Sequence, residues 1–262
     1  MKKMMKFFIK LLVRIIVIAV IVISLVLLFL KYPYILFESE AEHRGITIYS
    51  DEKFDDSTDQ LINNILERVT EIEIYETSYT PSVYLINDQS LFEKFAQVLQ
   101  ERKHSLGLNL IIFDNIFINA KQVNKISSDH NPDFKHTHYA GALDQIIAHQ
   151  MVKGLIKNRI GYFDYFRTPS WKIGGYCEYG STIASIRKDK TTSLLRRAKP
   201  LYDSGILDYE TQSVTNYKSQ LLVEYLGEIH KLTFEEIIYN PIDYNALSAE
   251  FDEWYYYQIL KK

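Results

Sequence analysis

The sequence has one cysteine, Cys177, among its 262 residues. A single cysteine cannot form an intramolecular disulfide, and its presence is compatible with either side of a membrane. The sequence also lacks internal repeats, a glycine-rich phosphate loop, a nucleophile elbow and a low-complexity linker. These absences remove the sequence support for a disulfide scaffold, a phosphate-loop nucleotide binder and a repeat protein.

Acidic residues are absent from the first 31 residues, which hold six basic ones: Lys2, Lys3, Lys6, Lys10, Arg14 and Lys31. The rest of the chain therefore carries 24 basic and 33 acidic residues, a net charge of −9. Contacts to nucleic-acid phosphates need clusters of Lys and Arg. We expect no nucleic-acid partner.

An uncharged apolar run occupies residues 15–30. With its apolar flanks it provides about 20 residues, enough to cross a bilayer while Arg14 and Lys31 extend toward the interfaces. We expect the chain to contact the lipid bilayer through residues 11–34, with Tyr32 and Tyr34 in the interfacial aromatic belt. The positive-inside rule predicts a single-pass protein of the cell membrane with a cytoplasmic N-terminus and an extracytoplasmic C-terminal domain.

The alternative is a cleaved secretory signal peptide. Ser39, Glu40 and Ala41 offer a small-x-small cleavage site, but they lie well beyond the apolar run, which is longer than a typical signal-peptide core. We favour an uncleaved anchor. The chain then divides into a cytoplasmic basic tip with a transmembrane anchor at residues 1–37 and one domain at residues 44–262.

Strand and helix patterns alternate after residue 43. Apolar runs rich in β-branched residues predict strands at residues 46–50, 82–86, 108–113 and 116–118. Apolar residues at helical spacing predict helices at residues 61–74 and 89–99. Beyond residue 179 the pattern is helical, with a capping box at Thr233 and Glu236 and a helix break at Asn240 and Pro241. The predicted class is α+β.

Two predicted helices between residues 143 and 179 carry the candidate functional residues. The first, at residues 143–156, is apolar nearly all round, which is typical of a central core helix. His149, Gln150 and Lys153 occupy offsets i, i+1 and i+4 on it. The second helix follows a loop of charged and aromatic residues, and Thr168 and Pro169 suit its cap and first position.

The offsets of the first helix match the zinc-peptidase motif H-E-x-x-H, in which two histidines on one helix face bind the metal and the Glu is the general base. The second helix resembles the pattern W-x-x-E-G-x-A-E-Y of gluzincins, the zinc peptidases whose third ligand is a Glu. Four residues fall on that pattern: Trp171, Gly175, Glu178 and Tyr179. Cys177 stands for the Ala and Gly174 for the ligand Glu. The sequence is thus similar to the membrane-anchored, peptidase-MA-like branch of the gluzincins.

The resemblance implies a zincin-like domain, with an N-terminal mixed sheet beside a substrate cleft, two central site helices and a helical C-terminal half. It also implies that the chemistry is lost, because only His149 is kept. Gln150 cannot accept a proton from water, Lys153 repels a divalent cation, and Gly174 has no side chain. We expect no catalytic residue, no bound zinc and no other cofactor.

Without a metal, we expect the Glu178 carboxylate to form a cluster with Lys153 and His149, because a buried ammonium needs a partner. The alternative is a solvated Lys153 at the mouth of the cleft. Glycines at 174 and 175 cost helix stability, so we expect them to allow a close approach to the first helix. Cys177, which replaces a small Ala, is expected to be buried rather than nucleophilic.

A polar loop at residues 127–138 carries His130, His136 and His138. In an extended segment His136 and His138 point the same way, and with Asp129 or Asp133 they can gather a metal. Solvated loop histidines are far commoner, so a metal site on this loop is the less favoured alternative.

The favoured function is a membrane-anchored, extracytoplasmic pseudo-metallopeptidase that binds or scaffolds a peptide or protein partner in the former substrate cleft. The first alternative is an atypical hydrolase or metalloprotease that uses His149 and Glu178, with or without a metal recruited by the loop histidines. The second alternative is a structural anchor whose cleft has closed.

Overall fold

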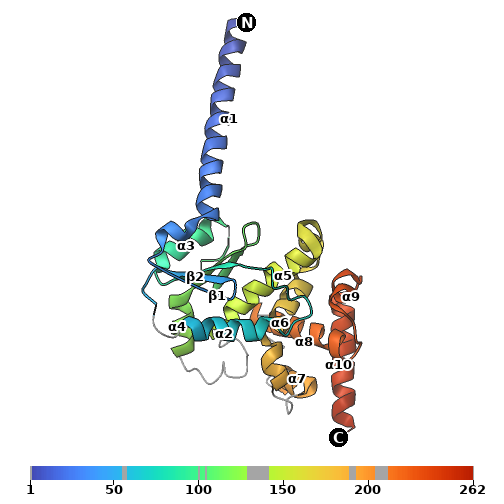
Figure 1. Cartoon of the computed structure of the whole chain (residues 1–262). Helices are drawn as coiled ribbons and strands as arrows, with labels where there is room; N and C mark the ends of the chain where they lie inside the picture. Colours follow the sequence, from blue (N-terminus) through green and yellow to red (C-terminus); the bar gives the residue numbers. More distant parts are fainter. Residues whose placement is uncertain are drawn as a thin grey trace.

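The computed structural model describes residues 2–54, 58–99, 101–103, 105–128, 142–188, 193–203 and 212–261. Within these ranges the chain is α+β, as the sequence predicted (Figure 1). An apolar N-terminal helix leads into a mixed sheet, and helices make up the C-terminal half.

Helix α1 (Lys2–Lys31) projects from the rest of the molecule (Figure 1). Its segment Ile9–Lys31 has a mean hydropathy of 3.3 and is long and apolar enough to cross a membrane. A short 3-10 helix, η1 (Pro33–Leu36), turns the chain into the sheet.

The sheet has the strand order β1-β2-β3-β5-β4 in the described structure. Its strands are β1 (Ser39–His43), β2 (Ile46–Ser50), β3 (Ser82–Ile86), β4 (Gly107–Leu110) and β5 (Asn115–Asn119). The three central strands, β2, β3 and β5, are parallel, and the edge strands β1 and β4 are antiparallel to their neighbours. Parallel neighbours need crossover connections. The crossovers contain α2 (Thr58–Val69) and α3 (Gln89–Val98).

Four details of the sheet region differ from the sequence prediction. Strand β1 was not predicted, because its side chains alternate between partly buried and exposed and it has no apolar face. Helix α4 (Ala120–Ser128), which is mostly polar, was not predicted either. Helix α2 ends at Val69, since Ile72 and the residues after it form turns. Strand β4 ends at Leu110, because the chain then turns through Asp114, whose φ is +53°.

Each face of the sheet is covered by helices. One face packs against α2, α4 and α5 (Leu143–Arg167), and α6 (Ser170–Lys188) packs against α2 and α5 in the same main core. The other face carries a row of stacked rings from neighbouring strands: Tyr49, Tyr84 and Phe117, with centroid distances of 5.0 and 5.1 Å. Burial of rings of this size makes a large contribution to core energetics.

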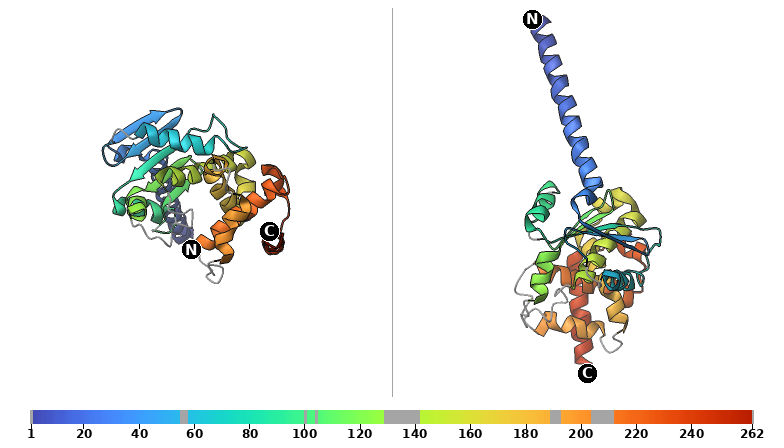
Figure 2. Two further views of the ribbon diagram at one scale, coloured as in Figure 1. Left: turned by 90° about the horizontal axis from the view of Figure 1, so that it is seen from below. Right: turned by 60° about the vertical axis from the view of Figure 1, so that its left-hand side comes forward.

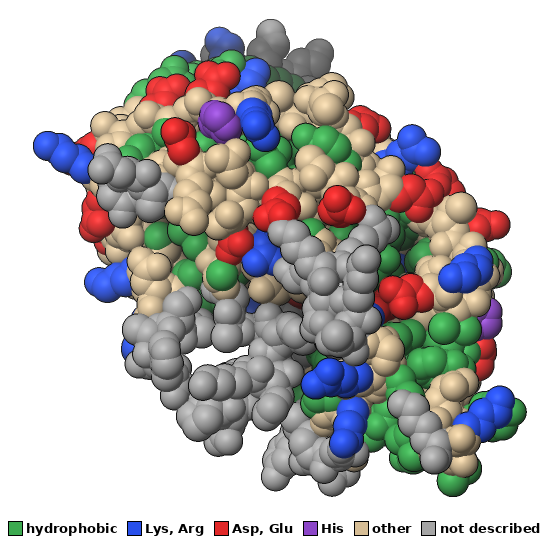
Figure 3. Space-filling view, turned by 60° about the horizontal axis from the view of Figure 1, so that its bottom comes forward, with side chains coloured by type: hydrophobic (Ala, Val, Ile, Leu, Met, Phe, Trp, Pro, Cys, Tyr) green, Lys and Arg blue, Asp and Glu red, His purple; other side chains and the backbone are tan. Residues whose placement is uncertain are grey.

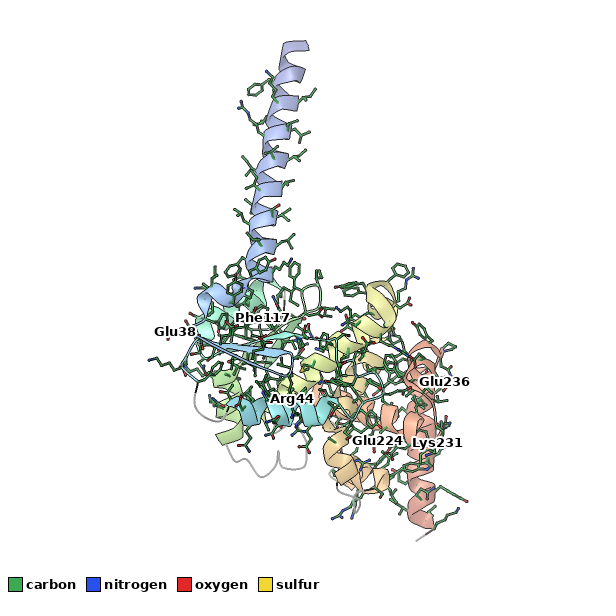
Figure 4. The ribbon with its side chains drawn as sticks, viewed as in Figure 1. Glu38, Arg44, Phe117, Glu224, Lys231 and Glu236 are labelled. Atoms are coloured by element: carbon green, nitrogen blue, oxygen red, sulfur yellow. The ribbon has the colours of Figure 1, made fainter. Side chains whose placement is uncertain are left out.

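The aromatic row extends to α3 and to the end of α1. Phe95 of α3 stacks on Phe117 at 4.4 Å and on Phe29 of α1 at 5.6 Å. Asn115 Nδ2 donates to the carbonyl oxygen of Leu30 at 2.8 Å, and Leu30 is buried. These contacts hold the last turn of α1 against the sheet, and Figure 4 shows Phe117 beneath the foot of α1.

The helical half consists of α7 (Leu194–Asp203), α8 (Gln212–Glu228), α9 (Phe234–Tyr239) and α10 (Tyr244–Leu260). The predicted capping box of Thr233 and Glu236 is present, and α9 ends before Pro241 as predicted. Helix α8 packs against α6, and α10 lies on the side of the molecule away from the sheet (Figures 1 and 2). Acidic and basic side chains are interspersed over the face turned away from α1 (Figure 3).

Helix α5 is longer than predicted. The stretch after residue 156, expected to be a loop, continues as helix to Arg167 with a kink at Gly161, whose φ is +79°. Glycine accepts this left-handed backbone conformation without steric cost. The Thr168 hydroxyl donates to the Asp164 carbonyl oxygen at 2.8 Å, so Thr168 closes the end of α5 and was wrongly assigned as a cap of the next helix.

Candidate functional site

The candidate site lies where α5 passes α6. Helix α5 is buried on most of its surface, with Ile147, Met151 and Val152 each at most 1% exposed. This confirms the prediction of a central core helix. Only Thr168 and Pro169 separate α5 from α6, so the chain turns back directly and α6 packs along α5.

His149 and Glu178 form a pair between the two helices. His149 Nδ1 lies 3.1 Å from Glu178 Oε1, and their side chains are 17% and 7% exposed. The predicted pairing of these two residues is confirmed. An imidazole that donates from Nδ1 keeps its lone pair on Nε2, and metal-ligating histidines are commonly oriented in this way by a carboxylate.

Lys153 is not part of this pair in the described structure. It is partly buried one turn after His149, and it makes no ion pair or hydrogen bond within the described ranges. The Lys153 charge lowers the pKa of the Cys177 thiol, but burial raises that pKa by more. The expected three-residue cluster is therefore reduced, among the described residues, to contact between His149 and Glu178.

Gln150 faces the edge strand β4. The side chain is 5% exposed, and its Nε2 donates to the Gly107 carbonyl oxygen at 3.4 Å. Its backbone oxygen accepts from Asn109 Nδ2 at 2.5 Å. Within the described residues, Gln150 Oε1 is buried without a hydrogen-bond partner. A buried polar atom without a hydrogen bond costs about 1–3 kcal/mol of stability. A bound molecule that donates a hydrogen bond to this amide oxygen would remove that cost.

The two glycines of α6 do not approach α5 as expected. A Cβ on Gly175 would lie 2.4 Å from the backbone oxygen of Ser219, so Gly175 allows α6 to pack closely on α8. A Cβ on Gly174 would meet no atom within 4 Å. Gly174 lies one turn before Glu178, on the same face of α6. The place where the resemblance puts a ligand Glu is thus open space.

A pocket of about 230 Å³ opens beside the pair. It is bounded by the turn before β4, by α5, α6 and α8, and its lining residues are Ser105, Leu106, Gly107, Gln145, Ile146, His149, Gln150, Glu178 and Asn216. The volume is close to the lower end of the range for small-ligand sites. The pocket combines one imidazole, one carboxylate and several amides with an apolar floor.

Cys177 is fully buried, as expected. Burial raises the pKa of its thiol to about 12, with a further raising effect from Glu178. The thiol is therefore protonated at neutral pH and is not poised as a nucleophile.

The metal-site candidates are placed only in part. Among the described residues, no group of three or more His, Cys, Asp or Glu side chains is arranged to hold a metal. His130, His136 and His138, with Asp129 and Asp133, lie outside the described residues.

The sequence interpretation missed the residues that β4 and α8 bring to the site. Asn109 holds the α5 backbone at Gln150, and Asn216 lines the pocket. Asn109 had a weak signal, because it is a polar residue between two leucines in a predicted strand. Asn216 had no signal in the sequence, because its position at the pocket depends on how α8 packs against α6.

No family model matches the sequence, and neither a curated protein nor a solved structure is significantly similar to the chain. The interpretation of the site therefore rests on its own geometry.

Proposed function

We propose that the chain is a membrane-anchored, extracytoplasmic pseudo-metallopeptidase. Its zincin-like domain binds a peptide or protein in the pocket beside His149 and does not cleave it. The observation that carries this proposal is the His149 and Glu178 pair at 3.1 Å, set between two core helices beside the pocket. The pair keeps an imidazole oriented as a metal ligand would be, where the other required groups are missing.

The missing groups argue against zinc-dependent hydrolysis. Structural and catalytic zinc sites use at least three protein ligands. Here Gln150 is an amide bound to the β4 backbone, Lys153 carries a positive charge, and Gly174 has no side chain. His149 thus has the orientation of a first metal ligand, but the site has no general base and no second or third ligand.

The edge strand β4 supports a peptide as the partner. It ends the sheet in the described structure, and Gly107 at its start lines the pocket. Proteins commonly bind extended peptides by adding them as a strand to such an edge, with adjacent pockets reading the side chains. The amides of Gln150 and Asn216 supply polar contacts at that position.

The bilayer anchor is part of the same proposal. The segment Ile9–Lys31 has the length and composition of a membrane span, and the five basic residues before the apolar run favour a cytoplasmic N-terminus. The domain then lies on the extracytoplasmic side. Its net charge of −9 beyond residue 31 gives no support to a nucleic-acid partner.

Restoring the missing groups tests the proposal. The triple variant Gln150→Glu, Lys153→His and Gly174→Glu should bind about one zinc ion per chain, because a zinc site needs three protein ligands and position 174 has room for a side chain. Zinc content is measured by mass spectrometry of the purified full chain in detergent. The control Asn158→Glu, an exposed change elsewhere on α5, should bind none. Failure of the triple variant to bind zinc, with its circular dichroism unchanged, would mean that the helices are not a zincin site.

The second candidate is a hydrolase in which the His149 and Glu178 pair acts as general base. The close pair at the pocket favours it. Against it, Ser105 is the one hydroxyl-bearing residue among the described residues that line the pocket, and no hydrogen bond joins it to His149 within those residues. Cleavage of fluorescein-labelled casein by the wild-type chain, abolished by His149→Ala, would establish this candidate instead.

A further inference from the structure

The end of α5 exposes a group of large apolar side chains. Past the kink at Gly161, Tyr162, Phe163 and Phe166 are 43%, 65% and 74% exposed, and Ile112 in the neighbouring β4–β5 turn is 60% exposed. Single exposed apolar residues are ordinary, but several of them on one helix end and on the turn bonded to it indicate a surface that meets a protein or a membrane. We call these four residues the α5 tip.

The α5 tip is tied to the end of α1 through the β4–β5 turn. Tyr162 Oη donates toward the carbonyl oxygens of Ile111 and Ile112, at 3.2 and 3.3 Å. At the other end of the same turn, Asn115 Nδ2 donates to the Leu30 carbonyl oxygen at 2.8 Å. Figure 1 shows the end of α5 and the foot of α1 on the same side of the domain, with the β4–β5 turn between them.

A partly buried ion pair strengthens this link. Lys157 Nζ lies 2.9 Å from Asp114 Oδ1, and the Lys157 side chain is 5% exposed. It also lies over the ring of Tyr162, 5.1 Å from the centroid. These contacts fix the α5 tip against the β4–β5 turn.

The position of a bilayer follows from α1. The 23 residues of Ile9–Lys31 rise about 34 Å at 1.5 Å per residue, close to the thickness of the hydrocarbon core. Lys31 then lies at the interface. Because Leu30 and Phe29 are packed against the sheet and α3, the domain cannot move far from that interface, and the α5 tip lies at its level.

We propose that the α5 tip is a second membrane contact, in which Phe163, Phe166 and Ile112 enter the interfacial region of the bilayer that α1 spans. Amphipathic aromatic rings favour this depth, and Tyr162 matches Tyr32 and Tyr34 at the foot of α1. Arg167, whose guanidinium lies 3.6 Å from the centroid of Phe163, supplies a cation for lipid phosphates. The contact rests on the proposed membrane anchor and fixes the rotation of the domain about α1.

The contact is tested by an environment-sensitive fluorophore on Phe163→Cys in the full chain, reconstituted into phosphatidylcholine and phosphatidylglycerol vesicles. Phe163 is 65% exposed, so its replacement leaves the core intact. The native thiol does not compete, because Cys177 is fully buried and its pKa is about 12. We expect a blue-shifted emission, and a loss of fluorescence that is greater with a nitroxide near the lipid headgroup than with one near the acyl-chain end.

Two further labels serve as controls. Tyr257→Cys replaces a ring that is 55% exposed and lies under Lys261, as Phe163 lies near Arg167, but on α10 at the far end of the molecule. It should show neither the blue shift nor the quenching. Val20→Cys, in the middle of α1, should be quenched more by the deep nitroxide.

The outcomes separate the contact from the anchor. If Val20 is quenched while Phe163 behaves like Tyr257, the second contact is wrong and the anchor stands. If Val20 is not quenched, α1 does not span the bilayer, and both the anchor and the contact are wrong.

Discussion

At the residue scale, the most buried charged side chains of the described structure have identifiable partners. His149 is oriented by Glu178, and buried Lys157 is paired with Asp114. The Lys172 ammonium, which is 1% exposed, donates to the backbone carbonyl oxygens of Ile238 and Asn240, and burial lowers its pKa. Such partners offset the cost of removing charge from water.

A further ion pair, between Arg197 and Glu224, is more buried than those above and gives a prediction about stability. Glu224 is 0% exposed, and Arg197 Nε donates to its Oε2 at 3.3 Å (Figure 4 labels Glu224). Glu224→Leu removes the carboxylate from a buried guanidinium, so we expect a loss of about 3–5 kcal/mol in the free energy of unfolding. The measurement is denaturant unfolding of the full chain in detergent.

The control is the double variant Arg197→Met and Glu224→Leu, which removes both charges and should recover most of the loss. A single variant as stable as the wild type would show that the pair is not desolvated as the structure indicates.

At the scale of elements, local patterns could be predicted and packing partners could not. The apolar surface of α5, the strands β2, β3 and β5 and the Thr233 capping box follow from local residue patterns, and each was predicted. The parallel pairing of those strands was not predicted. Strand β1 has no apolar period, and it exists because β2 offers it an edge. The site was predictable to the same degree: the helix offsets place His149 opposite Glu178, while Asn109 and Asn216 arrive by tertiary packing.

The glycine pair of α6 tests the packing of this element. Gly175→Ala should destabilise the fold by about 1–3 kcal/mol, because its Cβ would overlap the Ser219 backbone of α8. Gly174→Ala meets no neighbour and should stabilise the helix by up to about 1 kcal/mol. Thermal unfolding followed by circular dichroism measures both changes. Equal effects of the two substitutions would contradict the observed packing of α6 on α8.

At the scale of the whole molecule, the proposed anchor and the domain form one connected body. The aromatic row joins the end of α1, through Phe95, to the three parallel strands β2, β3 and β5. The β4–β5 turn joins the end of α1 to the end of α5. The same β4 edge forms one wall of the pocket. A partner bound there would therefore be presented in a fixed orientation relative to the proposed membrane.

The central proposal is that the chain is a zincin-like scaffold without a catalytic metal, and the zinc content of the wild-type full chain tests it most directly. The protein is purified in detergent without chelators, dialysed against excess zinc and then against metal-free buffer, and analysed by mass spectrometry. With His149 the one residue kept among the three expected ligands, the account predicts far less than one zinc ion per chain. One tightly held zinc ion per chain, lost in His149→Ala, would contradict it.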